Sequence, residues 1–288
     1  MVELCVTKNE QPSGSNDRDE AAVRAANKFG DAVHENSSSQ WLRTPARWPV
    51  CVTRQVGTID VLAVPLDLSQ EALESLKSTL SPAEIRRAGR FHFSHHRDRF
   101  IAARGVLRRA LAHCLGTEPD KLEFAYGTHG KPELAGAFAN SGFKFNLAHC
   151  ENLALIAITY RRRIGVDLER IRLLRDMSEL VSRFFSGREV AAFHNLTDQQ
   201  KPEAFFNLWT RKEAWLKATG EGISQYLAEV EVSFLPGEAA ELLHLPRISA
   251  AQGPWSLREL RPAKDFAAAI AFEGEIVEVA CRRWESIE

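Results

Sequence analysis

Several features that would place a protein in a specialised class are missing from this sequence of 288 residues. No stretch reaches the ~18 uninterrupted apolar residues that a membrane-spanning helix needs. The first seven residues lack the basic and apolar parts of a signal peptide. The 37 Lys and Arg side chains are balanced by 38 Asp and Glu, so the net charge of −1 creates no field that attracts nucleic acid or an anionic membrane. We therefore expect no membrane and no nucleic-acid partner.

The five cysteines offer little for a disulfide scaffold, because their number is odd and no two form a C-x-x-C pair. Such cysteine usage is typical of a reducing compartment. Together with the missing signal peptide, it predicts a soluble cytoplasmic protein. The chain also has no G-x-x-x-x-G-K-[ST] loop, no G-x-G-x-x-G after a strand and no G-x-S-x-G elbow. These absences argue against P-loop nucleotidases, dinucleotide-binding domains and serine hydrolases of the α/β class.

What is present is a chain with 44% hydrophobic residues, which is enough for a sizeable core. Residues 8–40 are too polar to bury the apolar area that would repay ordering. We therefore predict a disordered tail over residues 1–50, followed by an N-terminal lobe over 51–164 and a C-terminal lobe over 165–288.

The two halves of the globular part follow the same order of elements. Each has a Ser-x-x-Glu capping box, beginning at Ser81 or Ser186, and a long helix that a glycine ends, Gly116 or Gly220. Each half then closes with an apolar strand. This repeated order of elements predicts an internal duplication, with the binding site in a cleft between two similar α/β lobes.

A pair of carboxylates stands out in the segment Gly165-Val-Asp-Leu-Glu169. In an extended segment alternate side chains face the same side, so Asp167 and Glu169 are neighbours. Oxygen ligands of this kind suit Mg²⁺, which takes one or two carboxylates together with phosphate oxygens and water. The alternative is a solvated strand end in which these acids pair with Arg163 or Arg170.

The second long helix carries Glu213 and Lys217 on one stripe, four residues apart. An exposed ion pair of this spacing would contribute only about 0.3–0.5 kcal/mol. However, Trp209 and Trp215 flank Glu213, which places the acid at the edge of a packed surface. There it could serve as a third metal carboxylate.

Three further residues are candidate phosphate ligands. His149 lies in Phe145–Cys150, F-N-L-A-H-C, and either donates to a phosphate or is a satisfied structural histidine. Arg104 stands between two small residues that leave room for a ligand. Lys131 follows Gly130 in a loop that glycine and proline stiffen, where it either presents an ammonium to a phosphate or is simply a turn lysine.

Three ordered motifs together resemble the Sfp-type 4'-phosphopantetheinyl transferases. They are F-N-L-A-H-C at 145–150, G-V-D-L-E at 165–169 and W-T-R-K-E-A-W-L-K-A-T-G-E-G-I at 209–223. The similarity spans about residues 59–272. It implies an α+β fold of two similar lobes related by a pseudo-twofold axis, each with a small, mainly antiparallel sheet packed on a long helix. It also implies coenzyme A between the lobes and Mg²⁺ on its pyrophosphate.

The resemblance assigns roles to individual residues. In this sequence the metal carboxylates would be Asp167, Glu169 and Glu213. Lys217 and His149 would contact the phosphates, and Gly130 and Lys131 would lie at the nucleotide. Arg104 would also contact coenzyme A, and Arg87 would bind its 3'-phosphate.

The implied reaction is attack of a serine hydroxyl of an apo acyl or peptidyl carrier protein on the β-phosphorus of coenzyme A, releasing 3',5'-ADP. Glu213 would accept the serine proton, directly or through a water on the metal. Carriers of this system are typically acidic, so the arginine-rich first lobe or the edge around Arg170, Arg172 and Arg175 is a candidate docking surface. Because one chain holds both lobes, we expect a monomer.

Two alternative functions fit the same residues. A coenzyme A-binding module without catalysis would bind the nucleotide and transfer nothing. A Mg²⁺-dependent nuclease would want a lysine in an E-x-K beside its acid, and Glu169 is followed by Arg170 and Ile171. The chain also departs from the family pattern, because Ala148 and Cys150 replace the usual serines beside the histidine. At Glu84, next to the proposed 3'-phosphate contact, some relatives carry a lysine.

Overall fold

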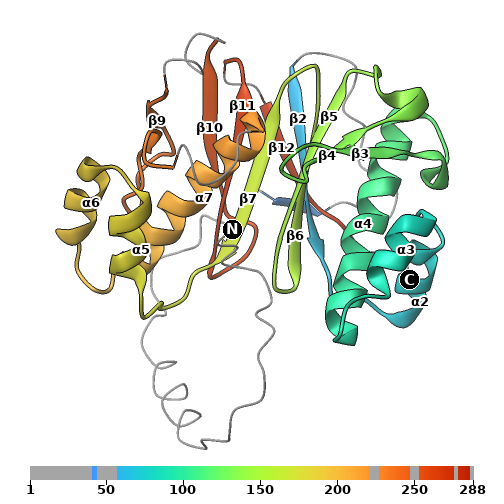
Figure 1. The fold of residues 1–288 in the computed structure, drawn as a ribbon, viewed down its shortest axis with the longest axis horizontal. Helices are drawn as coiled ribbons and strands as arrows, with labels where there is room; N and C mark the ends of the chain where they lie inside the picture. The colour runs from blue at the N-terminus through green and yellow to red at the C-terminus, as the bar shows by residue number, and fades with distance from the viewer. Residues whose placement is uncertain (1–40, 44–56, 221–226, 247–252, 276–277, 286–288) are drawn as a thin grey trace, which may run out of the picture.

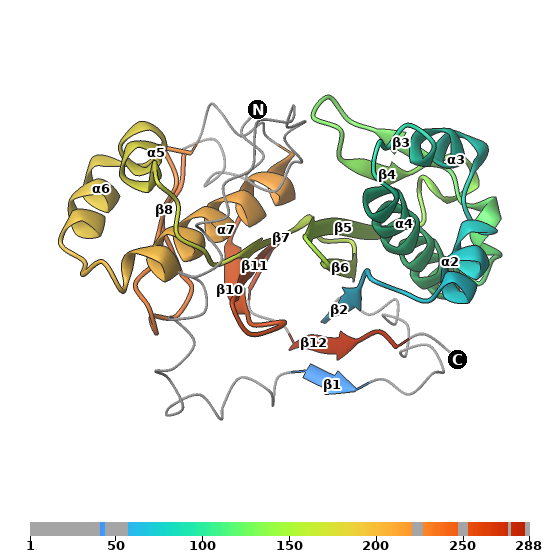
Figure 2. The same ribbon diagram turned by 90° about the horizontal axis from the view of Figure 1, so that it is seen from below.

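A computed structural model shows two lobes whose sheets face each other in the middle of the molecule (Figure 1). A long helix covers the outer face of each sheet, so the layers run helix, sheet, sheet, helix (Figure 2). This arrangement confirms the predicted two-lobed α+β fold. The structure describes residues 41–43, 57–220, 227–246, 253–275 and 278–285.

The first lobe has a five-stranded sheet in the order β1-β12-β2-β6-β5, and the second has a three-stranded antiparallel sheet in the order β10-β11-β7. In the first sheet β2, β6 and β5 pair antiparallel, whereas β1, β12 and β2 pair parallel. The strands are β1 (Trp41–Arg43), β12 (Glu278–Arg283), β2 (Thr58–Pro65), β6 (Leu153–Tyr160), β5 (Phe143–Cys150), β10 (Trp255–Leu260), β11 (Phe266–Glu273) and β7 (Ile164–Arg170).

Strand alternation explains the three hydrophobic clusters. In β11 the odd-numbered alanines from Ala267 to Ala271 pack with the long helix of the second lobe, and the residues between them, such as Ile270, pack in the cluster between the two sheets. In β2, Val61 likewise faces the other sheet while Leu62 faces the helix of its own lobe. Both sheets are therefore buried on both faces.

The predicted helices and caps are present in both lobes. Ser81 and Ser186 form reciprocal capping boxes with Glu84 and Glu189, as the sequence predicts. The long helices end at glycines in the left-handed conformation, which an L side chain adopts only at a cost. The helices are α3 (Pro82–Ala88) and α4 (Ser94–Leu115) in the first lobe, and α6 (Gly187–His194) and α7 (Lys201–Thr219) in the second.

The two capping boxes share a second feature that the sequence pattern did not reveal. Each capping glutamate is buried and paired with a cation from the long helix of its lobe: Glu84 with Arg108, and Glu189 with Lys212. A buried charge is retained only when it is paired and hydrogen-bonded. The same buried ion pair between capping glutamate and long helix occurs in both lobes, which supports the pseudo-twofold relationship.

The structure departs from the predicted domain boundaries at two places. Residues 41–43, expected in the tail, form β1, and the rest of the predicted tail lies outside the described residues. The C-terminal strand β12 pairs with β2, Val279 opposite Ile59, and so completes the first sheet although it belongs to the predicted second lobe. Pairing across more than 200 residues leaves no local signal in a sequence.

The remaining elements are short. No helix in the part of the chain that the structure describes is both long and apolar enough to span a membrane. These short elements are α2 (Gln70–Lys77), η3 (Pro119–Lys121), β3 (Phe124–Tyr126), β4 (Pro132–Leu134), η4 (Gly136–Phe138), α5 (Met177–Phe184), β8 (Glu231–Val232) and β9 (Leu242–His244).

Candidate active site

The centre of the site is the contact between β7 and α7. Gly165 makes this contact possible, because a Cβ at this position would lie 2.1 Å from the carbonyl oxygen of Ala214 and 2.3 Å from the backbone nitrogen of Ala218. No residue larger than glycine fits there without moving the helix. The carboxylates that follow on the same face of β7 are thereby brought against the last two turns of α7.

Asp167 and Glu169 face α7, since their partners in the neighbouring strand, Ala269 and Ala267, pack in the cluster around that helix. Glu213 lies on the helix itself. The three acids are 5%, 4% and 3% exposed, so the alternative of a solvated strand end is wrong. The ammonium of Lys217 donates to Asp167 Oδ1 at 2.6 Å, which joins helix and strand.

The electrostatics of this cluster are those of crowded acids beside two cations, Lys217 and Arg172. Burial, and then repulsion from Asp167, raise the pKa of Glu169 to about 8. Burial opposes the charge on Lys217, but attraction to Asp167, Glu213 and Glu169 outweighs it and raises the pKa of Lys217. The Lys217 ammonium thus stands among three acids, and Arg172 Nη1 lies 3.8 Å from Glu169. With its pKa at about 8, Glu169 is largely protonated at pH 7 in the absence of a metal.

The donor set fits a hard divalent cation. All three candidate ligands are carboxylates, and Asp167 Oδ2 is buried without a hydrogen-bond partner among the described residues. Such an oxygen is costly unless something binds it. As the side chains stand, no group of three His, Cys, Asp or Glu residues within the described ranges is drawn together as metal ligands. The Lys217 ammonium instead provides the positive charge beside Asp167.

The F-N-L-A-H-C strand, β5, links the two lobes. The buried Asn146 accepts a hydrogen bond from the backbone of Val166 at 2.8 Å, which ties β5 to β7 directly before the acids. His149, further along β5, is exposed but lies among enough protein atoms to be partly desolvated. This desolvation, together with the charges of Lys217 and Arg87, lowers the pKa of His149. The imidazole is therefore neutral at pH 7 and placed between the first lobe's arginines and the acids.

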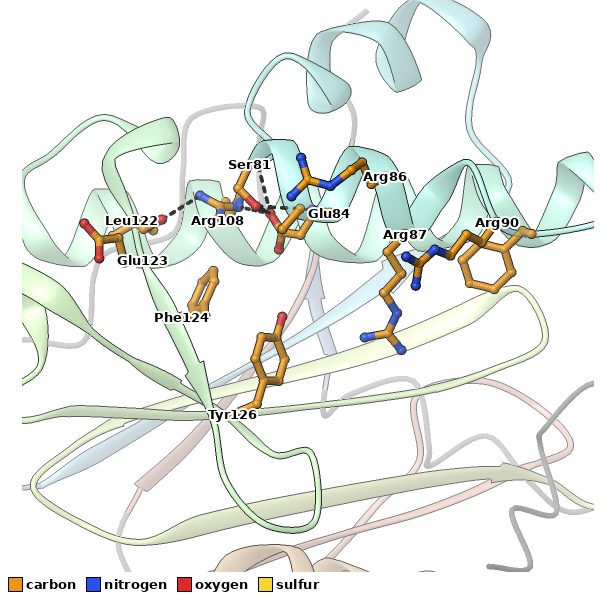
Figure 3. Close-up of a pocket in the computed structure, with 12 residues that line it drawn as sticks. Ser81, Glu84, Arg86, Arg87, Arg90, Arg108, Leu122, Glu123, Phe124 and Tyr126 are labelled. Atoms are coloured by element: carbon orange, nitrogen blue, oxygen red, sulfur yellow. Dashed lines mark hydrogen bonds and ion pairs between the residues drawn. The ribbon is translucent and has the colours of Figure 1, made fainter.

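A cavity of about 870 Å³ opens in the first lobe between α3 and β3 (Figure 3). Arg86, Arg87 and Arg90 reach over it from α3 and the turn that follows, and Tyr126 stands on the opposite wall. Because Arg87 belongs both to this lining and to the charges acting on His149, the cavity lies on the side of the first lobe that faces the acids.

Glu84 does not contribute negative charge to this cavity, because two arginines neutralise it. Its carboxylate accepts from Arg104 at 2.8 Å and from Arg108 at 2.6 Å, and both cations hold its pKa below the usual value despite burial. Arg104 also donates to the hydroxyl of Tyr126 at 3.1 Å. The structure therefore places Arg104 behind the cavity wall, where it supports Tyr126 and Glu84, and not at an open ligand position.

The turn at residues 127–131 joins β3 and β4. Gly130 has a φ of +78° and open space around it, as expected for a tight turn. The Lys131 ammonium does not point into the cavity: it donates to the carbonyl oxygens of Ile164, at 3.0 Å, and Lys217. Its burial lowers the pKa of Lys131 to about 8.

The structure thus brings together Asp167, Glu169, Glu213 and Lys217, with His149 beside them and Arg87 in the adjacent cavity. It gives Arg104 and Lys131 supporting positions. The role of Gly165 and the neutralisation of Glu84 went unpredicted, because both depend on contacts between distant segments. The one local signal available was Gly165 itself, because a glycine within a buried strand often marks a site where another backbone approaches closely.

Three buried acids, the Lys217 ammonium and an arginine-lined cavity thus lie on facing sides of the two lobes. Comparison with known proteins gives the class. The family model for the 4'-phosphopantetheinyl transferase superfamily matches residues 163–271, and the model for the N-terminal part of 4'-phosphopantetheinyl transferase matches residues 67–161.

Relatives with named activities agree with this match. The 4'-phosphopantetheinyl transferase HetI of Nostoc sp. is 44% identical over 234 residues, which cover 81% of this chain and 94% of that protein. A putative 4'-phosphopantetheinyl transferase of Synechocystis sp. is 39% identical over 54% of this chain and 62% of its own. The 4'-phosphopantetheinyl transferase of Bacillus subtilis is 25% identical over 56% of this chain and 68% of its own.

The chain belongs to the 4'-phosphopantetheinyl transferase superfamily. It is a 4'-phosphopantetheinyl transferase, an enzyme that moves the phosphopantetheine group of coenzyme A to a carrier protein. The resemblance and the activity expected from the sequence are thus confirmed.

Proposed function

We propose that the transfer takes place at the β7–α7 contact, with Mg²⁺ held by Asp167, Glu169 and Glu213. The observation that carries the proposal is the buried cluster of three carboxylates around a single ammonium. When bound there, Mg²⁺ supplies positive charge for the pyrophosphate of coenzyme A and for the leaving phosphate. Asp167 Oδ2 is buried and lacks a hydrogen-bond partner among the described residues, and such a cation would supply the missing interaction.

Different side chains around the cluster would bind the phosphates and accept the proton. The Lys217 ammonium, held charged by the acids, would bind a phosphate oxygen and offset the charge that grows on the leaving group. The neutral His149 would donate one N–H to the pyrophosphate. Glu213 would accept the proton of the carrier's serine hydroxyl as that oxygen attacks the β-phosphorus and 3',5'-ADP leaves.

The nucleotide end of coenzyme A would lie in the cavity of the first lobe. Arg87 would bind the 3'-phosphate, since its guanidinium lines this cavity on the side of His149. The internal neutralisation of Glu84 by Arg104 and Arg108 supports the assignment, because it removes Glu84 as a competitor for the arginines of α3. Tyr126 would form the opposite wall at the turn that contains Gly130.

The carrier protein would dock at the edge that follows β7. Arg170, Arg172 and Arg175 lie there, and Leu173 between them is 83% exposed. Arg170 pairs with Glu151 and Arg172 with Glu169, so an acidic helical carrier would exchange with these acids for cations around an apolar contact. Because all of these groups come from one chain, the proposed working unit is the monomer.

The test of the metal and base assignments is intact-mass spectrometry of an apo carrier protein incubated with the enzyme, coenzyme A and Mg²⁺. We expect a gain of one phosphopantetheine mass that EDTA abolishes and added Mg²⁺ restores. Glu213→Gln should lower the transfer rate by about 10²–10⁴-fold, the usual contribution of a general base. Its matched control is Glu203→Gln in the first turn of the same helix, where Glu203 pairs with Arg261.

Unchanged transfer in the Glu213→Gln variant would remove this residue from the mechanism. Calorimetric titration with Mg²⁺ separates ligation from proton transfer, because it needs no turnover. We expect weaker binding in Asp167→Asn and Glu169→Gln than in the Glu203→Gln control. Equal affinity in all variants would place the metal elsewhere.

A further inference from the structure

The end of α7 is held by side chains from the other lobe. Lys131 Nζ donates to the carbonyl oxygen of Lys217, and His129 Nδ1 lies 3.1 Å from that of Gly220. A carbonyl oxygen only accepts, so His129 carries its proton on Nδ1. The last carbonyls of a helix have no helical N–H partner. Two side chains of one turn in the first lobe therefore bind two carbonyls at the C-terminus of the second lobe's main helix.

The same ammonium also reaches the start of β7. Lys131 Nζ lies 3.0 Å from the carbonyl oxygen of Ile164, the residue before Gly165. At Gly165 the strand comes so close to the helix that a Cβ would be 2.8 Å from the backbone carbon of Lys217. Lys131 thus bridges strand and helix beside their closest approach.

We propose that the turn 127–131 is an inter-lobe clasp in which Lys131 and His129 position the last turn of α7, and with it the Lys217 ammonium. The inference rests on the proposed function, because it takes Lys217 to be a phosphate ligand. Lys217 is then fixed twice: its backbone carbonyl by Lys131, and its side chain by Asp167. Lys131 and His129 are positioning residues, acting on the reaction through Lys217.

The chemistry of the Lys131 environment suits this role better than an open phosphate contact. The ammonium is largely buried, and two of its donors are used by neutral carbonyl oxygens of the other lobe. A positive charge at a helix C-terminus also interacts favourably with the helix dipole. A ligand phosphate would have to compete for an ammonium that is already bound on two sides.

The two roles separate in kinetics. A residue that contacts the nucleotide equally in the ground state and transition state changes KM for coenzyme A and leaves kcat unchanged. A residue that orients Lys217 changes kcat, because a displacement of about 1 Å at a reacting group can cost ~10²-fold in rate.

The experiment uses the full chain with Lys131→Met, which keeps the length of the side chain and removes its donors, and with His129→Ala, a milder change at an exposed residue. Lys121→Met, at a lysine that is 69% exposed, is the control. Intact-mass assays give kcat and KM for coenzyme A, and hydrogen exchange follows the backbone amides of residues 214–220.

We expect Lys131→Met to lower kcat by about 10–100-fold. KM for coenzyme A should change by less than about 3-fold. Exchange should accelerate in residues 214–220 and not in the first lobe. His129→Ala should show the same pattern more weakly. Because Lys131 acts through Lys217, Lys131→Met should add little in a Lys217→Met background, in contrast to the additive behaviour of independent sites.

Two outcomes distinguish a failure of the clasp proposal from a failure of the proposed function on which it rests. If Lys131→Met or His129→Ala raises KM for coenzyme A while kcat and the exchange of residues 214–220 stay as in the control, the clasp is wrong and the role of Lys217 stands. If Lys217→Met itself transfers at the wild-type rate, the proposed function of Lys217 fails.

Discussion

Replacing Gly165 by alanine tests whether the close approach of β7 and α7 builds the active site. The added Cβ would lie 2.1 Å from the carbonyl oxygen of Ala214, whereas real Cβ atoms essentially never come within 3.0 Å of another heavy atom. The obstacle is the backbone of α7, so no side-chain rotation relieves it. Helix and strand must therefore separate by roughly 1 Å, enough to cost ~10²-fold in rate when it displaces a reacting group.

The expected result is a folded protein with a much slower reaction. Overpacking of a core contact costs typically 1–3 kcal/mol, which we expect to appear in urea unfolding of Gly165→Ala. The transfer rate, measured by intact mass and normalised to folded protein from circular dichroism, should fall by about 100-fold.

Gly187→Ala is the matched control for this prediction. A Cβ at Gly187, at the start of α6, meets no atom within 4 Å, and the residue does not have a positive φ. This variant should keep the wild-type rate and unfold at the same or slightly higher urea concentration. A Gly165→Ala variant with the rate and stability of this control would refute the steric reasoning.

Further predictions concern the buried charges. Glu84→Gln and Glu189→Gln each leave a buried cation without its carboxylate and should lower the free energy of unfolding by about 3–5 kcal/mol in chemical denaturation. Glu74→Gln, in a surface pair, should cost less than about 1 kcal/mol, and equal losses would contradict the burial argument. Since the pKa of Glu169 is raised from 4.5 to about 8, its folded form binds the extra proton, and stability without metal should fall as pH rises across this window. Saturating Mg²⁺ or Glu169→Gln should flatten that fall in urea titrations between pH 4.5 and pH 8, and an unchanged slope would remove Glu169 as its source.

The parts of the site that lie within one element follow from local sequence rules. Alternation along a strand placed Asp167 and Glu169 on one face, and helical spacing placed Glu213 and Lys217 on one stripe, and both are seen in the structure. Capping boxes are equally local, because the serine and the glutamate are three residues apart. Such features depend on backbone geometry that neighbouring residues dictate.

Contacts between distant segments could not be predicted in the same way. Lys131 was expected at the nucleotide, yet its ammonium binds Lys217, 86 residues further along the chain. Arg104 was expected at coenzyme A and instead holds Glu84 and Tyr126. In both cases the cation binds acceptors within the protein. The acceptor that each cation binds depends on packing within and between the lobes. A sequence pattern contains no information on distances between residues that are far apart in the chain.

An alignment of the two lobes shows where their long helices differ in charge. Arg108 precedes Gly116 by the same interval as Lys212 precedes Gly220, which aligns the two long helices. In that alignment Glu213 corresponds to Arg109, whose guanidinium binds Ser75 on the surface, and no acid of α4 takes its place. Of the two aligned positions, only the one in the second lobe therefore carries a buried carboxylate, Glu213.

The first lobe supplies the complementary charge. Its capping glutamate is neutralised, so the arginines of α3 present a net positive wall to the ligand. Coenzyme A carries a pyrophosphate and a separate 3'-phosphate. Under the proposed function, the carboxylates would hold Mg²⁺ for the pyrophosphate and the arginines would bind the 3'-phosphate. Both lobes retain the buried capping-box pair and the long helix that a glycine ends, whereas position 109 of the first lobe and position 213 of the second carry opposite charges.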